Sequence, residues 1–207
     1  MESSLIIEHF TSCSEGYLLK RKFLDWRIMI VDLYRNGEIG KASFKKHLTR
    51  NYAVGMLSLP KRNDFFYSTC QIKESNAKNN LDKIIKKYSN NQWNEMFDAL
   101  CMPSDTFLYK YIEVDRSRGI RTKVACCRKH DSESVILESM TKYMFENRIF
   151  DGEVFIYTQK EPCLNCELVI QQFMHRHPLV KVTLFYDQVN NINLSSKYPW
   201  LFRKERG

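Results

Sequence analysis

The sequence lacks a long uninterrupted run of apolar residues. Its longest candidate membrane segment, "WRIMIVDLY" at 26–34, contains charged residues and is far shorter than a membrane span. The beginning, "MESSLIIEHFTSCSEG", has neither the basic start nor the apolar stretch of a signal peptide. These two absences predict a soluble protein that acts in a cytoplasm and has no membrane partner.

The cysteines do not have the regular spacing of a disulfide scaffold. Their number is odd, and the expected compartment is reducing, so we expect free thiols. The seven are Cys13, Cys70, Cys101, Cys126, Cys127, Cys163 and Cys166.

The chain also lacks internal repeats and long low-complexity tracts. Its 207 residues are 43% hydrophobic and 13% aromatic, which predicts a folded globule with a real core. Negative charge is in the minority, because the formal net charge is +8 and the basic residues occur in clusters. Such clusters attract polyanions, above all nucleic acid, although a solvated basic surface without a partner explains them equally well.

The N-terminal part has one clear helical pattern. Apolar residues at helical spacing predict a helix over 15–36 that ends at Gly37, followed by a shorter helix over 41–49. Residues 52–72 show no clear period, and we expect a loop that contains at most one short strand. Residues 73–80 form the most linker-like run of the chain.

The C-terminal part alternates between the two kinds of element. After one or two helices over 81–100, the expected elements are strands 106–115 and 120–127 as a hairpin, helix 131–147, strand 153–157, helix 163–175 and strand 180–186. This order favours parallel strands with helical crossovers. The tail is too short for another crossover, so a fifth strand would be antiparallel or supplied from elsewhere.

Two short motifs fall at the beginnings of the last two helices. The stretch "HDSE" contains His130, Asp131 and Glu133, and "PCLNC" contains Cys163 and Cys166. If both helices follow strands of one sheet, the motifs meet at its carboxyl edge, where open α/β sheets have their sites. Cysteines three apart share a helix face and can bind one metal ion.

This ordered set resembles the zinc-dependent nucleobase deaminase superfamily, whose signature has a ligand, a glutamate and paired cysteines. More narrowly, "DSE" with "PCLNC" is similar to the bacterial toxin deaminases. The resemblance implies an α/β, cytidine-deaminase-like three-layer core, a mixed sheet with helices on both faces, preceded by an α-helical N-terminal extension. The resemblance covers about residues 80–187. The expected domains are 1–78 (extension), 79–190 (deaminase-like) and 191–207 (basic and aromatic tail).

The resemblance implies a Zn²⁺ ion held by Asp131, Cys163 and Cys166, with Glu133 moving protons in a hydrolytic deamination of a nucleobase. Spacing favours Asp131 as the ligand, because His130 is about 100° away around the helix. Charge favours His130, because a more anionic centre acidifies water less. Asp131 could also simply cap its helix. The choice between these ligands stays open.

A different site uses partly different residues. Cys127 and His130 form a C-x-x-H pair that, with Cys163 and Cys166, would enclose a structural zinc in a nucleic-acid-binding module without catalysis. That module would need Cys127 and ignore Glu133, whereas a deaminase would need Glu133 and tolerate Cys127→Ser. A deaminase-like fold without activity, serving as an interaction partner, is a third hypothesis.

If the protein is a deaminase, the resemblance favours cytosine in nucleic acid as its target base. Single-stranded DNA is the first expected substrate, and free nucleosides are the alternative. Candidate backbone contacts are the basic residues of the predicted hairpin, Arg116, Arg118, Arg121 and Lys123. Aromatic side chains that could stack on bases, or else belong to the core, are Phe65, Phe66, Tyr67 and Trp200. An immunity or carrier protein and delivery into another cell are further expectations from the resemblance.

Overall fold

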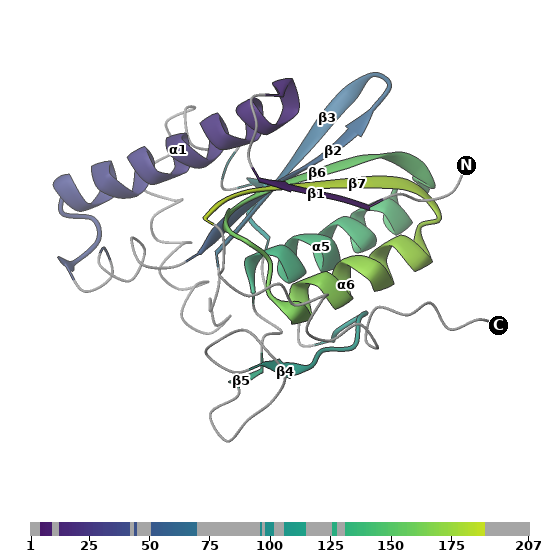
Figure 1. Ribbon diagram of the computed structural model, residues 1–207. Coiled ribbons are helices and arrows are strands. Elements are labelled where there is room, and N and C mark those ends of the chain that lie inside the picture. Colours follow the sequence, from purple (N-terminus) through teal and green to yellow (C-terminus); the bar gives the residue numbers. More distant parts are fainter. Residues whose placement is uncertain are drawn as a thin grey trace.

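A mixed five-stranded sheet forms the centre of the computed structural model (Figure 1). The structure describes residues 5–9, 13–41, 44, 51–69, 96, 98–101, 106–114, 126–127 and 131–188. The strand order is β1-β7-β6-β2-β3. The strands are β1 (Leu5–His9), β2 (Tyr52–Leu59), β3 (Arg62–Thr69), β6 (Asp151–Lys160) and β7 (Leu179–Gln188).

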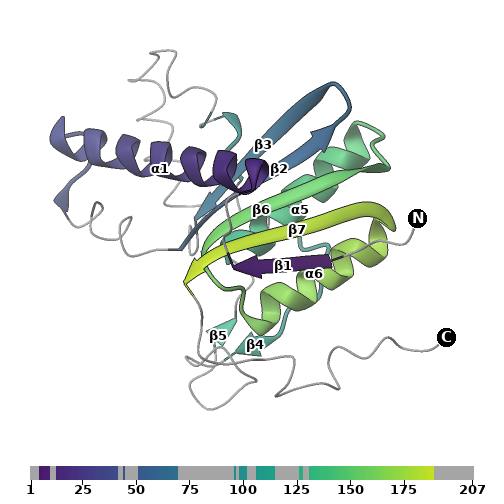
Figure 2. The same ribbon diagram turned by 45° about the horizontal axis from the view of Figure 1, so that its top comes forward.

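Helices cover both faces of this sheet. Helix α1 (Ser14–Arg35) lies on one face, and α5 (Ser132–Glu146) and α6 (Leu164–Arg176) lie side by side on the other (Figures 1 and 2). The predicted α/β class, with a mixed sheet between helices and a helix near the N-terminus, is confirmed. In the part of the chain that is described, no helix is long and apolar enough to cross a membrane.

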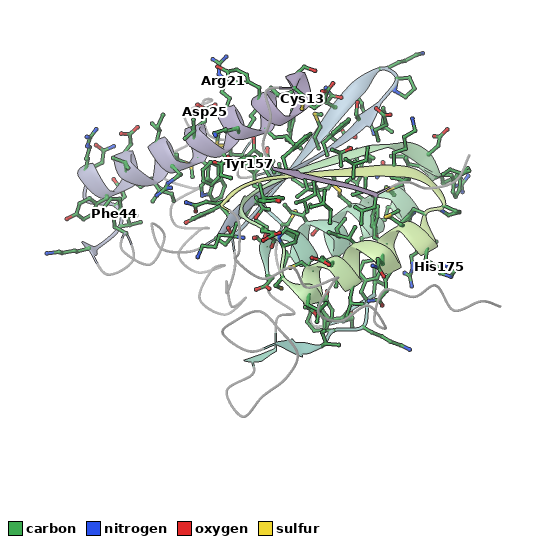
Figure 3. All side chains as sticks on the ribbon, viewed as in Figure 1. Cys13, Arg21, Asp25, Phe44, Tyr157 and His175 are labelled. Carbon is green, nitrogen blue, oxygen red and sulfur yellow. The ribbon has the colours of Figure 1, made fainter. Side chains whose placement is uncertain are left out.

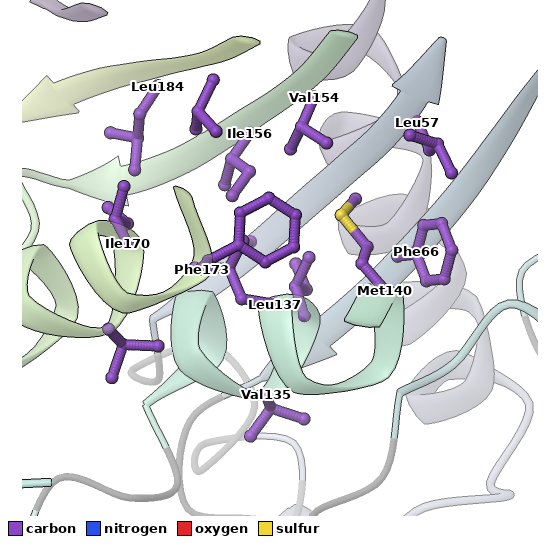
Figure 4. Close-up of a cluster of buried hydrophobic side chains, with 14 of the residues drawn as sticks. Leu57, Phe66, Val135, Leu137, Met140, Val154, Ile156, Ile170, Phe173 and Leu184 are labelled. Atoms are coloured by element: carbon purple, nitrogen blue, oxygen red, sulfur yellow. The ribbon is translucent and has the colours of Figure 1, made fainter. Parts of the chain in front are cut away.

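Each face of the sheet has its own hydrophobic core. Between the sheet and α5 and α6, the stripe of Ile136, Leu137, Met140 and Met144 is fully buried, as predicted, and packs with Phe173 of α6 (Figure 4). The opposite core is built on α1, whose buried positions recur at helical spacing. The predicted positions of these three helices are therefore confirmed.

Strands β6 and β7 form the predicted parallel unit around α6. Their register pairs Val154 with Val182 and Ile156 with Leu184, and all four side chains are buried. The fifth strand comes from the N-terminal end of the chain, because β1 pairs parallel with β7, for instance Ile7 with Leu184. An antiparallel fifth strand, one of the two predicted alternatives, is not found at this edge.

The prediction of a loop over residues 52–72 is wrong for β2 and β3, which form an antiparallel hairpin of eight residues each around Pro60 and Lys61. The first six residues of β2 are all buried, because one face of the strand meets α5 and the other meets α1. A strand buried on both faces has no alternation of apolar and polar residues, which explains why its pattern was missed.

Residues 1–78 therefore supply α1 and three strands of the same sheet. The proposed domain boundary at 78/79 and the tail over 191–207 lie outside the described residues, as do the linker over 73–80 and most of the helices expected at 41–49 and 81–100. The division into domains stays a prediction.

Of the predicted hairpin over 106–127, the described residues show a short antiparallel pairing of β4 (Glu113–Val114) with β5 (Cys126–Cys127) in a separate small sheet. Helix α5 thus does not follow a strand of the main sheet, and the prediction that both site helices do so is wrong. Residues 106–112 belong to no strand, and side chains of α5 and α6 accept several of their backbone N–H groups. Glu138 accepts the backbone N–H groups of Leu108 and Tyr109, at 2.9 and 3.1 Å.

Gly55 allows close contact between β2 and α5. A Cβ atom at Gly55 would lie 2.6 Å from Cε of Met140 and 2.7 Å from Cγ2 of Ile136. The methionine end can move aside, but the β-branched isoleucine is restricted to essentially one rotamer in a helix. A side chain at this position must therefore separate the strand from the helix that carries Asp131 and Glu133.

We expect Gly55→Ala to lower the free energy of unfolding by about 1–3 kcal/mol, because it overpacks this contact. Urea unfolding followed by circular dichroism measures the change. Gly40→Ala is the matched control, since among the described residues beyond its chain neighbours no atom lies within 4 Å of a Cβ there, and its effect should stay within about 0.5 kcal/mol. Equal stability of both variants would contradict the packing described for Gly55.

Candidate metal and catalytic site

The residue that precedes α5 and the residue that precedes α6 face each other. Asp131 and Cys163 occupy the N-cap positions of the two helices, and neither side chain makes a capping hydrogen bond. The alternative in which Asp131 merely caps its helix is therefore not what the structure shows. Its carboxylate oxygen Oδ2 lies instead 3.2 Å from Sγ of Cys163.

Asp131, Cys163 and Cys166 form one compact group of possible metal ligands. The two sulfur atoms are 3.4 Å apart, and Oδ2 of Asp131 is 3.6 Å from Sγ of Cys166. All three residues are buried, and their ligand atoms lie within 4.8 Å of one another. Ligand atoms at zinc bond lengths of about 2.0–2.3 Å lie about 3.3–3.8 Å apart in a tetrahedron, so this donor set fits a zinc ion.

Glu133 lies beside this group, in the first turn of α5, and is 1% exposed. Its Oε2 atom is 3.7 Å from Sγ of Cys166. Hydroxyl groups of Ser132 and Thr158 donate hydrogen bonds to the carboxylate, at 3.1 Å to Oε2 and 2.8 Å to Oε1. The side-chain amide of Asn51 adds a hydrogen bond to Oε1, at 3.2 Å. A buried carboxylate thus stands within reach of whatever the three donors bind.

The electrostatics of the group favour a bound cation. The pKa of the Cys166 thiol is raised well above its ordinary value, first by its hydrogen bond with Cys163, then by burial and by the neighbouring anionic groups of Glu133 and Asp131. A divalent cation held by the same side chains reverses this effect, because it stabilises the thiolate. The N-termini of α5 and α6 add positive dipole ends on the same side.

Behind the site, α5 and α6 hold the segment that leads into β4. Glu138, buried on α5, also accepts the hydroxyl of Tyr111 at 2.8 Å. On α6, Asn165 lies between the two cysteines in sequence and accepts the backbone N–H of Ile112, at 2.9 Å. These contacts fix the start of β4 next to the N-terminal end of α6.

Sequence analysis missed three residues of the site, namely Asn51, Ser132 and Thr158. Asn51 immediately precedes β2, so it was hidden by the failure to predict that strand. Thr158 lies near the carboxyl end of β6, and the general position of sites in open α/β sheets could have identified it. Ser132 is a neighbour of both motif residues.

Several predicted site residues lie outside the described residues: His130, Arg116, Arg118, Arg121, Lys123 and Trp200. Cys127 belongs to β5, but its possible partner His130 is not described, so the closed structural zinc site stays an untested prediction. Of the aromatic residues proposed for stacking, Phe66 and Tyr67 are buried in the two cores. Phe65 is partly buried, with the ammonium of Lys22 4.8 Å from its ring centre.

Comparison with known protein families gives one match. The model of the toxin-deaminase family, described as the BURPS668_1122 family of deaminases, matches residues 40–188. This range is more than half of the chain and includes Asn51, both motifs and strands β2, β3, β6 and β7. No curated protein and no solved structure matches the chain.

Proposed function

The chain belongs to the toxin-deaminase family, and we therefore propose that it is a zinc-dependent hydrolase that converts cytosine to uracil in nucleic acid. Single-stranded DNA is the proposed preferred substrate. The observation that carries the proposal is the position of Glu133, buried and 3.7 Å from a member of a compact Asp-Cys-Cys group. A purely structural metal site has no use for a buried carboxylate at that position.

We propose that Asp131, Cys163 and Cys166 hold the zinc ion. When bound, zinc supplies a Lewis acid that brings the pKa of water towards about 7. Three protein ligands leave a fourth position for water or substrate. The carboxylate of Asp131 takes the place that histidine has in the more common signature, so this centre is more anionic than those with a neutral third ligand.

Glu133 is the proposed acid and base of the reaction. Water adds to C4 of cytosine, and the amine leaves as ammonia. One proton of the water ends on ring N3 of the uracil, and the other must travel to the leaving nitrogen. The carboxylate of Glu133 takes this proton and then returns it. Its burial excludes bulk water, and its hydrogen bonds hold it in place for both transfers.

Charge and chain connectivity support nucleic acid over a free nucleoside. The net charge is +8, and Arg116, Arg118, Arg121 and Lys123 belong to the connection between β4 and β5. The backbone of Ile112, immediately before β4, is bonded to Asn165, between the two cysteines of α6. The basic segment follows β4 directly in sequence, and we propose that its side chains bind a phosphate backbone.

The family also suggests how such an enzyme is used. A toxin-type deaminase would act in the cytoplasm of a target cell, where nucleic acid is accessible, after delivery from another cell. We propose that it works with a carrier and that an immunity protein protects the producing cell.

Substrate class is tested by incubating the protein with single-stranded DNA, duplex DNA, RNA and cytidine and sequencing or chromatographing the products. We expect cytosine-to-uracil conversion in single-stranded DNA at least about tenfold faster than in duplex DNA, because extruding a paired base costs a few kcal/mol. The rate at low DNA concentration should fall as salt rises. Conversion of free cytidine at the highest rate, without salt dependence, would contradict the proposed substrate class.

A further inference from the structure

The two oxygen atoms of Glu133 have different surroundings. Oε1 accepts two hydrogen bonds, from Thr158 at 2.8 Å and Asn51 at 3.2 Å. Oε2 accepts one hydroxyl, from Ser132 at 3.1 Å, and faces Sγ of Cys166 at 3.7 Å. A carboxylate oxygen has about two lone pairs, so Oε1 is fully occupied. Oε2, which accepts a single hydroxyl, lies on the side of the proposed metal ligands.

Thr158 occupies a rigid position. Its neighbour Tyr157 lies beside α1 (Figure 3) and packs against Phe23 of that helix, with ring centres 5.3 Å apart. The alternation along β6 therefore directs Thr158 to the opposite face, towards α5. Thr158 is 0% exposed and pairs with Ala53 in the register of β2 and β6. Its β-branched side chain has few rotamers, so the strand determines where its hydroxyl points.

The direction of this hydrogen-bond chain is fixed. The amide of Asn51 donates to Oγ1 of Thr158 at 2.9 Å, so the single hydroxyl hydrogen of Thr158 is left for Oε1 of Glu133. Nδ2 of Asn51 also lies 3.3 Å from Ser132 Oγ, but the two amide hydrogens go to the closer acceptors on Thr158 and Glu133. The carboxylate is thereby connected to two neighbouring strands, β2 and β6, in addition to its own helix.

We propose that Thr158 is a positioning residue for the deamination. By occupying Oε1 it turns Oε2 towards the metal ligands, and Oε2 becomes the oxygen that carries the proton. This inference rests on the proposed function, in which Glu133 carries that proton, and adds the strand residue that determines its orientation. Nothing in the two sequence motifs identifies Thr158.

The test compares Thr158→Val, which keeps the shape and removes the hydroxyl, with Thr158→Ser, which keeps the hydroxyl. We expect Thr158→Val to lower kcat about 10- to 100-fold, because a displacement of the acid–base group by about 1 Å has an effect of this size. KM should change by less than about threefold. Ser should restore kcat to within about threefold of wild type. Thr183→Val, the same change on the neighbouring strand β7, should keep the wild-type kcat.

Crystal structures of the same variants give a readout that does not depend on activity. Zinc content and melting temperature should be those of wild type in Thr158→Ser, while in Thr158→Val the carboxylate of Glu133 should rotate away from residue 158. If Thr158→Val does not fold, Thr158→Ala with the serine variant answers the same question. Wild-type kcat without the hydroxyl, or an unmoved carboxylate, overturns the positioning role.

The two failures can be told apart. If wild-type protein deaminates none of the four substrates, the proposed function fails. The orientation of Glu133 in the crystals then still decides whether Thr158 positions its carboxylate. If wild type is active and Thr158→Val equals it, only the role of Thr158 is wrong. If Thr158→Val and Thr158→Ser lose kcat to the same extent and both lose zinc, Thr158 only maintains the folded structure. That result also overturns the proposal.

Discussion

Replacing Glu133 with glutamine is expected to reduce kcat for deamination by about 10²- to 10⁴-fold, the range that general acid–base catalysis contributes. Glutamine has the same shape, and its carbonyl oxygen can accept the hydrogen bonds of Thr158 and Asn51, so the site should stay folded. What is lost is the ability to take and return a proton. Single-turnover rates on single-stranded DNA, sampled over hours, measure the loss.

The control for this variant is on the same helix. Glu146 is exposed at the end of α5, far from the two motifs in sequence, and Glu146→Gln should keep the wild-type rate. Zinc content and melting temperature of Glu133→Gln should match those of wild type. A glutamine variant that deaminates at the wild-type rate would remove Glu133 from the mechanism.

Cys166→Ser is expected to lose the metal and, with it, the activity. A serine hydroxyl is a poor zinc ligand compared with a thiolate, and the remaining pair of Asp131 and Cys163 offers only two donors. Zinc per chain should fall from about one to near zero, and conversion of single-stranded DNA should become undetectable. Elemental analysis of protein purified without chelator, together with the deamination assay, measures both effects.

Cys13→Ser supplies the matched control. Cys13 caps α1, where its Sγ accepts the backbone N–H of Gly16 at 3.3 Å, and serine is a better residue for that position. Zinc content and activity should therefore not change. Retention of zinc by Cys166→Ser, or its loss from Cys13→Ser, would show that the metal is bound elsewhere.

The two site helices were predictable because their information is local. In α5 and α6, apolar residues recur at helical spacing, which predicts the helices. The motif residues lie at the N-cap or in the first turn, so the motif in the sequence also marks where each helix begins. Asp131, Cys163 and Cys166 lie within reach of one ion because parallel packing of these helices brings their N-termini together.

The missing residues depend on long-range pairing. Asn51 is more than 80 positions before Glu133, and it reaches Glu133 only because β2 pairs with β6. Strand β2 is buried on both faces, so its sequence lacks the alternation that predicts strands. Thr158 was included in no motif, since a threonine near the end of a strand has no special pattern. Its hydrogen bond to Glu133 depends on the pairing of β6 within the sheet, which directs the threonine side chain towards α5.

X-ray absorption at the zinc edge of the purified protein tests the central claim most directly, because it counts the sulfur atoms around the metal. With Cys163, Cys166 and Asp131 as ligands, the spectrum should show two sulfur atoms at about 2.3 Å and lighter ligands at about 2.0–2.2 Å, one of them exchangeable. Three sulfur atoms with one nitrogen, as a closed site with Cys127 and His130 requires, or the absence of zinc, would contradict the account.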